Sequence, residues 1–145
     1  MRLTTFSDYS FRVLLYLAAA PDERATIVDM AQAYGISRNH LMKVVHLLGQ
    51  LGYVETLRGK GGGIRLAKPP ASIRAGEVLR ATEERFELAE CMEDKGGACR
   101  IERVCKLKHA LGDALAAFLK VLDGYTLADL APPRSPLVKV LFKSA

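Results

Sequence analysis

The spacing of apolar and polar residues divides the chain into several helices, one hairpin and one irregular segment. Near the start, apolar residues recur every three or four positions as far as Ala20, which is the spacing along one face of a helix. Thr5 or Ser7 is placed to cap the N-terminus of this helix. A longer stretch with the same spacing runs from about Lys106 to Leu122. The pattern therefore predicts a mainly helical chain.

Two shorter helices are predicted directly after the first one. Thr26 can cap one of them, and Gly35 can end it because glycine readily adopts the left-handed conformation that closes a helix. Ser37 can cap the next, which runs to about Gln50. Its expected inner face consists of Leu41, Val44, Val45 and Leu48. Two short helices joined by a glycine-containing turn are typical of a helix-turn-helix.

A small hairpin is predicted next. Two β-like runs, at 53–58 and 64–67, flank the glycine-rich segment GKGGG. Its tip and flanks carry basic residues with no acid between them: Arg58, Lys60, Arg65 and Lys68. We therefore expect a winged helix-turn-helix DNA-binding domain over 1–68, in a mainly α chain with a small β-hairpin.

The long helix carries two apolar stripes. One consists of Leu107, Leu111, Leu115, Phe118 and Leu122, and the other of Ala110, Ala114, Ala117 and Val121. We expect the first stripe to pack on the protein's own core and the second, made of small residues, to meet the same helix of a second copy. The alternative is one wide buried face within a single chain.

Composition and charge reduce the number of functional classes to which the protein can belong. The chain has 145 residues, of which 50% are hydrophobic and 26% charged, which excludes a disordered chain. It has neither an apolar run long enough to span a membrane nor a signal peptide, so we expect a cytoplasmic protein. The net charge is +5, and residues 1–68 hold nine basic and five acidic side chains. An excess of positive charge there favours a polyanion partner.

The outer face of the third helix supplies side chains suited to reading duplex DNA in the major groove. Arg38 can donate two hydrogen bonds to guanine, and Asn39 can pair with adenine. Lys43 and His46 lie one turn further on and can reach bases or phosphates. The hairpin offers Arg58, Lys60 and Arg65 to phosphates or the minor groove. Each residue alone is typical of a solvated surface, but together they predict double-stranded DNA as the partner.

Three cysteines form the second group that carries chemistry: Cys91, Cys99 and Cys105. Their spacing matches neither a CxxC redox site nor a zinc ribbon. Three thiolates in a basic segment suit an iron–sulfur cluster that needs a further ligand, for which His109, Glu90 and Glu93 are the nearest candidates. The alternative is three reduced thiols without a metal. No GxGxxG, nucleophile elbow or HExxH motif is present, so an enzyme is not expected.

Four segments together resemble one regulator family: LTTFSDYSFRVLLYLA, YGISRNHLMKVVHLLGQLGYVETLRGKGGGIRLAKP, CKLKHAL with the cysteines before it, and YTLADL. The chain resembles the NsrR family of nitric-oxide-sensitive repressors, in the winged-helix superfamily that also contains IscR. The resemblance implies a homodimer that binds an inverted-repeat operator and represses transcription. It also implies that 69–145 holds a cluster-binding loop and a dimerisation helix.

The resemblance further implies an iron–sulfur cluster on Cys91, Cys99 and Cys105, with Asp8 of the other subunit as the fourth ligand. We favour 4Fe–4S over 2Fe–2S, because three thiolates and one carboxylate suit a cubane. The IscR type has histidine at the third residue after the last cysteine, where this chain has Lys108. An IscR-type regulator of cluster or iron supply and a metal-free thiol sensor remain the alternatives.

Overall fold

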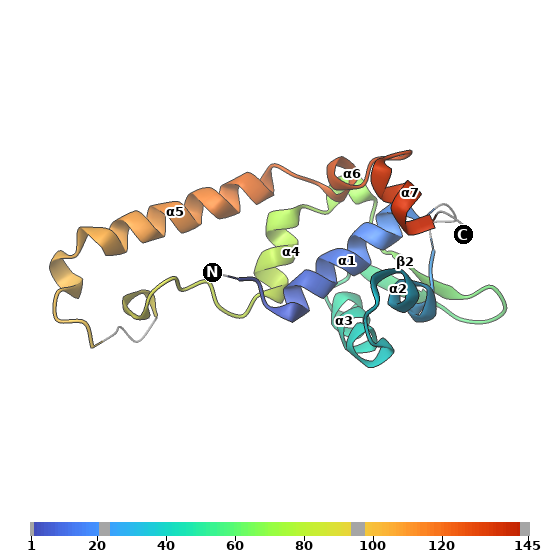
Figure 1. Ribbon diagram of the computed structural model, residues 1–145, viewed down its shortest axis with the longest axis horizontal. Coiled ribbons are helices and arrows are strands. Elements are labelled where there is room, and N and C mark those ends of the chain that lie inside the picture. The colour runs from blue at the N-terminus through green and yellow to red at the C-terminus, as the bar shows by residue number, and fades with distance from the viewer. Residues whose placement is uncertain (1, 21–23, 94–97, 143–145) are drawn as a thin grey trace.

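The computed structural model describes residues 2–20, 24–93 and 98–142 (Figure 1). The helices are α1 (Thr5–Ala19), α2 (Ile27–Tyr34), α3 (Arg38–Gln50), α4 (Ala75–Thr82), α5 (Lys106–Asp123), α6 (Leu127–Leu130) and α7 (Pro136–Phe142). The strands are β1 (Val54–Leu57) and β2 (Gly63–Leu66), and short 3-10 turns are η1 (Pro70–Ser72), η2 (Glu90–Met92) and η3 (Glu102–Val104). The mainly helical winged fold is as the sequence predicts.

Side-chain caps set where the first three helices begin. Thr4 caps α1, since its side chain accepts a hydrogen bond from the backbone N–H of Ser7 at 3.2 Å. The prediction that Thr5 or Ser7 caps this helix is therefore wrong by one residue or more. Thr26 caps α2 in a reciprocal capping box with Asp29. The predicted caps of α2 and α3 are confirmed.

The hydrophobic core lies around α1, which packs against α3, α4, α6 and β2. Its largest fully buried members include Leu14, Met30, Leu41, Leu48, Ile73 and Leu127. The C-terminal helix α7 adds an aromatic contact, with the ring of Phe142 4.8 Å from that of Tyr16. Residues on both sides of position 68 thus share one core, and the division into two functional regions stays a prediction.

The hairpin is short and antiparallel, with Val54 opposite Leu66 and Leu57 opposite Gly63. A third segment of chain lies along it. Ala25 and Ile64 exchange two backbone hydrogen bonds, of 2.9 Å and 2.7 Å. The segment before α2 therefore extends the small sheet and fixes the hairpin against the helix-turn-helix.

Helix α5 forms an arm that extends away from the other helices (Figure 1). None of its residues is buried. Its C-terminal end joins α4, where Arg80 makes two hydrogen bonds to Asp123, of 2.6 Å and 2.8 Å. The expectation that one stripe of this helix packs into the protein's own core is wrong, because no residue of α5 is buried and none belongs to the core cluster. No helix in the described ranges is long and apolar enough to cross a membrane.

Candidate nucleic-acid interface and metal centre

Helix α3 turns a buried face inward and a polar face to solvent. Leu41, Val44, Val45 and Leu48 are buried, as predicted. The four predicted DNA-contacting residues on this helix are all exposed: Arg38, Asn39, Lys43 and His46. Met42 lies among them with 51% of its surface exposed. The face combines guanidinium, amide, ammonium, imidazole and thioether groups, which can serve both base edges and phosphates.

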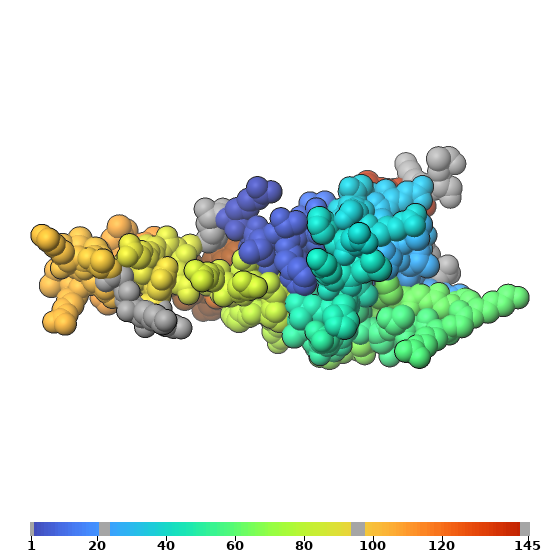
Figure 2. Space-filling model, turned by 90° about the horizontal axis from the view of Figure 1, so that it is seen from below, coloured from blue at the N-terminus to red at the C-terminus, as the bar shows by residue number. Residues whose placement is uncertain are grey.

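The tip of the hairpin is built on glycine. Gly59 and Gly61 have φ values of 94° and 80°, which side chains rarely allow. A Cβ on Gly62 would lie 2.4 Å from the carbonyl oxygen of Leu57, so this turn admits no side chain there. The tip projects at one end of the molecule, opposite the segment that leads into α5 (Figure 2). It presents the exposed side chains of Arg58 and Lys60.

Arg65 differs from the other basic residues of the hairpin because it has an acidic partner. It lies directly opposite Glu55 in the strand register. Its Nε donates a 2.6 Å hydrogen bond to the Glu55 carboxylate, and about half of each side chain is exposed. Arg65 is therefore less available to DNA phosphates than the sequence predicts. Glu55 precedes the basic run in sequence and comes to lie next to Arg65 only through the pairing of the two strands, which the sequence pattern does not reveal.

Removing this acid is expected to strengthen DNA binding. In a Glu55→Gln variant, Arg65 no longer has a carboxylate partner and can pair with a phosphate. We expect a gain in affinity of up to about fivefold, matching the ~1 kcal/mol that an exposed pair is worth. Fluorescence anisotropy with labelled duplex measures it. Glu84→Gln, which removes an exposed glutamate outside the hairpin, is the control and should change affinity little.

The three cysteines all belong to the segment between α4 and α5 or to its junction with α5. Cys91 lies in η2 and Cys105 directly precedes α5; both are partly buried, and Cys99 is exposed. None forms a disulfide. The described ranges hold no group of three His, Cys, Asp or Glu residues placed to bind one metal ion. The three thiols are free, and among the described residues they are not brought together as one metal-binding group.

A partly buried ion pair between Lys108 and Glu102 lies near two of these thiols. The Lys108 ammonium donates to the Glu102 carboxylate at 2.5 Å, and both side chains are largely covered. This hydrogen bond, with the nearby Cys91 and Cys105 thiols, raises the pKa of Lys108 above its ordinary value. Lys108 therefore keeps its positive charge beside two of the proposed ligands, where it can offset the charge of thiolates. His109, the alternative fourth ligand, lies on the exposed side of the helix.

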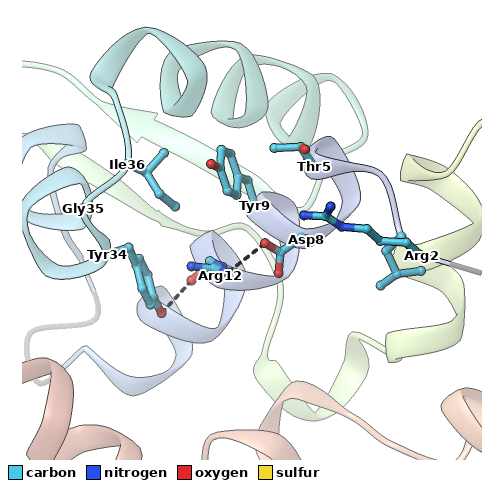
Figure 3. Close-up of a pocket in the computed structure, with 9 residues that line it drawn as sticks. Arg2, Thr5, Asp8, Tyr9, Arg12, Tyr34, Gly35 and Ile36 are labelled. Atoms are coloured by element: carbon cyan, nitrogen blue, oxygen red, sulfur yellow. Dashed lines mark hydrogen bonds and ion pairs between the residues drawn. The ribbon is translucent and has the colours of Figure 1, made fainter.

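Asp8 lies on α1 beside a cavity of about 470 Å³ (Figure 3). Its carboxylate forms an ion pair with the Arg12 guanidinium at 2.8 Å, with both side chains half-exposed. Arg12 also lies 5.7 Å and 5.9 Å from the ring centres of Tyr9 and Tyr34. Burial raises the pKa of Tyr34 to about 12, so its hydroxyl stays protonated and donates to the Arg12 carbonyl at 3.1 Å. Asp8 is thus tied to the turn between α2 and α3.

Residues 3–133 match the family described as Rrf2, iron-dependent transcriptional regulator. The HTH-type transcriptional regulator NsrR of Bacillus subtilis (strain 168) is 53% identical over 142 residues, covering 97% of each chain. The chain belongs to the Rrf2 family. It is a DNA-binding transcriptional regulator similar to NsrR, and the prediction that it is not an enzyme is confirmed.

Solved structures of other regulators share this Rrf2 fold. T. potens IscR superposes with a TM-score of 0.72 at 24% identity, over 90% of this chain and 85% of that one. CymR, the global cysteine regulator of B. subtilis, gives 0.71 at 26% identity, over 90% and 96%. The winged helix-turn-helix prediction is therefore confirmed.

The Asp8–Arg12 ion pair is absent from the sequence predictions, although two opposite charges four residues apart on one helix are a known signal for such a pair.

Proposed function

We propose that this Rrf2 chain is a cytoplasmic homodimeric repressor that binds an inverted-repeat operator under the control of a nitric-oxide-sensitive iron–sulfur cluster. One observation carries the proposal. Three free cysteines lie in the segment that leads into α5 or directly before that helix, and the other end of α5 joins α4, which packs on α1 within the domain that carries the exposed polar face of α3. The 53% sequence identity to NsrR of Bacillus subtilis, over 97% of the chain, supports the same function.

The donor set fits the cluster chemically. Cys91, Cys99 and Cys105 are free thiols, and Lys108 lies near Cys91 and Cys105 with its positive charge; thiolates are the usual ligands of iron–sulfur clusters. We propose that Asp8 of the partner subunit completes a 4Fe–4S site. When bound, the cluster supplies iron that reacts with nitric oxide. An oxygen ligand holds iron less firmly than a thiolate does, so the Asp8 side is the weakest point of this ligand set.

Asp8 is the residue through which the ligand set can act on DNA binding. In the single chain its carboxylate is held by Arg12, whose guanidinium lies against Tyr34 at the end of α2. As a ligand, Asp8 would give a carboxylate oxygen to iron and share its charge between the iron and Arg12, beside the turn that positions α3. It would also tie α1 of one subunit to the arm of the other. Because paired half-sites lie about 34–36 Å apart, a shift of a few ångströms between the recognition helices is enough to weaken binding.

Iron, acid-labile sulfide and the visible spectrum, measured on protein purified without oxygen, test this function. We expect about four irons per chain and bleaching of the spectrum by nitric oxide. A two-iron spectrum indifferent to nitric oxide indicates a regulator of cluster supply, which Lys108 in place of histidine disfavours. Three titratable thiols and no iron indicate a thiol sensor instead.

The Asp8→Ala variant tests the role of the carboxylate. We expect cluster loss in air to be faster by at least about tenfold, because one ligand and the tie between subunits are removed together. Operator affinity should fall as well. The visible absorption decay and an anisotropy titration measure the two effects. Asp113→Ala, which removes an exposed carboxylate from the arm, is the control. Unchanged cluster lifetime and affinity in Asp8→Ala would rule out this role.

A further inference from the structure

Arg24 lies beside the hairpin although it belongs to the segment between α1 and α2. Its Nη1 donates a 2.7 Å hydrogen bond to the carbonyl oxygen of Gly61 at the hairpin tip. The next residue, Ala25, holds the same hairpin through its two backbone hydrogen bonds with Ile64. The segment before α2 therefore delivers a guanidinium to the tip that carries Arg58 and Lys60.

The guanidinium has donors left over. Arginine has five N–H donors in a planar fork, and Arg24 gives one of them to Gly61. Its side chain is exposed and forms no ion pair with a carboxylate of the described residues. Asp22 and Glu23 precede it in the sequence and lie outside those residues. The exposed donors thus lie beside a tip whose neighbouring charges are positive.

We propose that Arg24 is a DNA-backbone contact that binds a phosphodiester while it braces the hairpin tip. The proposal rests on the DNA-binding function given above. A guanidinium fork matches the two free oxygens of a phosphate, and Arg24 presents that fork with one edge already fixed by Gly61. Because the bond to Gly61 orders the side chain before DNA arrives, less conformational freedom is lost on binding.

Holding the hairpin in place does not by itself explain the hydrogen bond from Arg24 to Gly61. The two backbone hydrogen bonds between Ala25 and Ile64 already fix the hairpin to the segment before α2. A further hydrogen bond between exposed groups adds little to folding stability. Gly61 has a φ of 80°, and Arg24 Nη1 reaches its carbonyl oxygen from a chain segment that the backbone already holds in place. The contact therefore positions the guanidinium more than it holds the fold.

The test uses the full-length chain, purified without oxygen, and a duplex selected on the wild-type chain from a random-sequence library. Anisotropy titrations over a range of salt concentrations give both the affinity and its salt dependence. For Arg24→Gln we expect roughly tenfold weaker binding per chain. The slope of log affinity against log salt should become shallower by about 0.9 per chain, because one phosphate contact is lost.

Two further variants distinguish a phosphate contact made by Arg24 from a purely structural role in holding the hairpin tip. Arg24→Lys keeps a charge without the fork, so we expect the wild-type slope with a smaller loss of affinity. Lys139→Gln removes an exposed charge from α7, away from the hairpin, and should leave affinity and slope unchanged. Weaker binding of Arg24→Gln with an unchanged slope would mean that Arg24 only braces the hairpin, and unchanged affinity would mean that it does neither; both overturn the proposal.

The wild-type chain separates this proposal from the function on which it rests. If the wild-type chain recovers no duplex from the library, DNA binding itself fails. If it does recover one, the Arg24 variants test the contact alone. Thermal unfolding of Arg24→Gln should match that of the wild type, which shows that any loss of affinity arises at the interface.

Discussion

Replacing Cys105 with alanine is expected to reduce bound iron and sulfide to below about a tenth of the wild-type content. Cys105 directly precedes α5, so its thiol joins the cysteine segment to the arm. With two thiolates remaining, the ligand set loses a strong donor, and the neighbouring Lys108 cannot replace it because it is protonated. Iron and sulfide analysis with visible absorption, on protein made without oxygen, measures the loss. Far-UV circular dichroism should be unchanged, because the side chain is outside the core.

His109→Ala is the matched comparison. This residue is four positions after Cys105 and exposed on the arm. We expect wild-type iron content in this variant, because Asp8 of the partner subunit is proposed as the fourth ligand. If His109→Ala loses iron while Asp8→Ala retains it, the ligand set is of the histidine-containing kind. If Cys105→Ala keeps its full iron content, Cys105 is not a ligand of the cluster.

The helices of the DNA-binding region could be predicted because their ends are encoded locally. Thr26 and Ser37 cap the helices they were expected to cap, and Gly35 ends α2 with a φ of 64°. The buried positions of α3 follow from the helical period alone. At the start of α1, three hydroxyl residues lie within a few positions, and the pattern could not tell that Thr4 is the cap.

What the sequence could not predict depends on contacts between distant segments. The pairing of Glu55 with Arg65 requires the strand register, and the bond from Arg24 to Gly61 crosses 37 positions of the chain. The direction of α5 is a third case. Its two apolar stripes show that it has a wide apolar side, but its direction depends on contacts at its C-terminal end with distant residues, among them the pairing of Asp123 with Arg80.

The exposed side of the arm supports the proposed dimer. Leu111, Leu115, Phe118 and Leu122 are half-covered, whereas Ala110, Ala114, Ala117 and Val121 are all exposed. Val121 alone has 60% of its surface exposed, and Leu107 has 64%. An apolar face of small side chains on an isolated helix lets another helix approach closely, and burying it is worth roughly 25 cal/mol per Å². We expect the second copy to pack against this face.

The substitution Ala114→Glu should therefore disrupt the dimer. Each subunit would place an unpaired carboxylate in the interface, at a cost of roughly 3 kcal/mol or more, which raises the dissociation constant at least about a hundredfold. Molar mass by light scattering over a dilution series measures this. Ala116→Glu introduces the same charge about 200° around the helix and should remain dimeric. A dimeric Ala114→Glu variant would mean that the copies meet through another surface.

The Ala114→Glu variant also distinguishes an effect on dimer formation from an effect on folding of the single chain. The arm contributes nothing to the hydrophobic core, so the unfolding midpoint of the DNA-binding region should be preserved in Ala114→Glu. Operator binding should nevertheless fall steeply, because an inverted repeat engages two recognition helices at a fixed separation and a monomer supplies one. Cluster retention should fall with it, since the proposed ligand Asp8 comes from the partner subunit. Loss of all three properties in a folded chain would show that the dimer, rather than the single chain, is the unit that senses and binds.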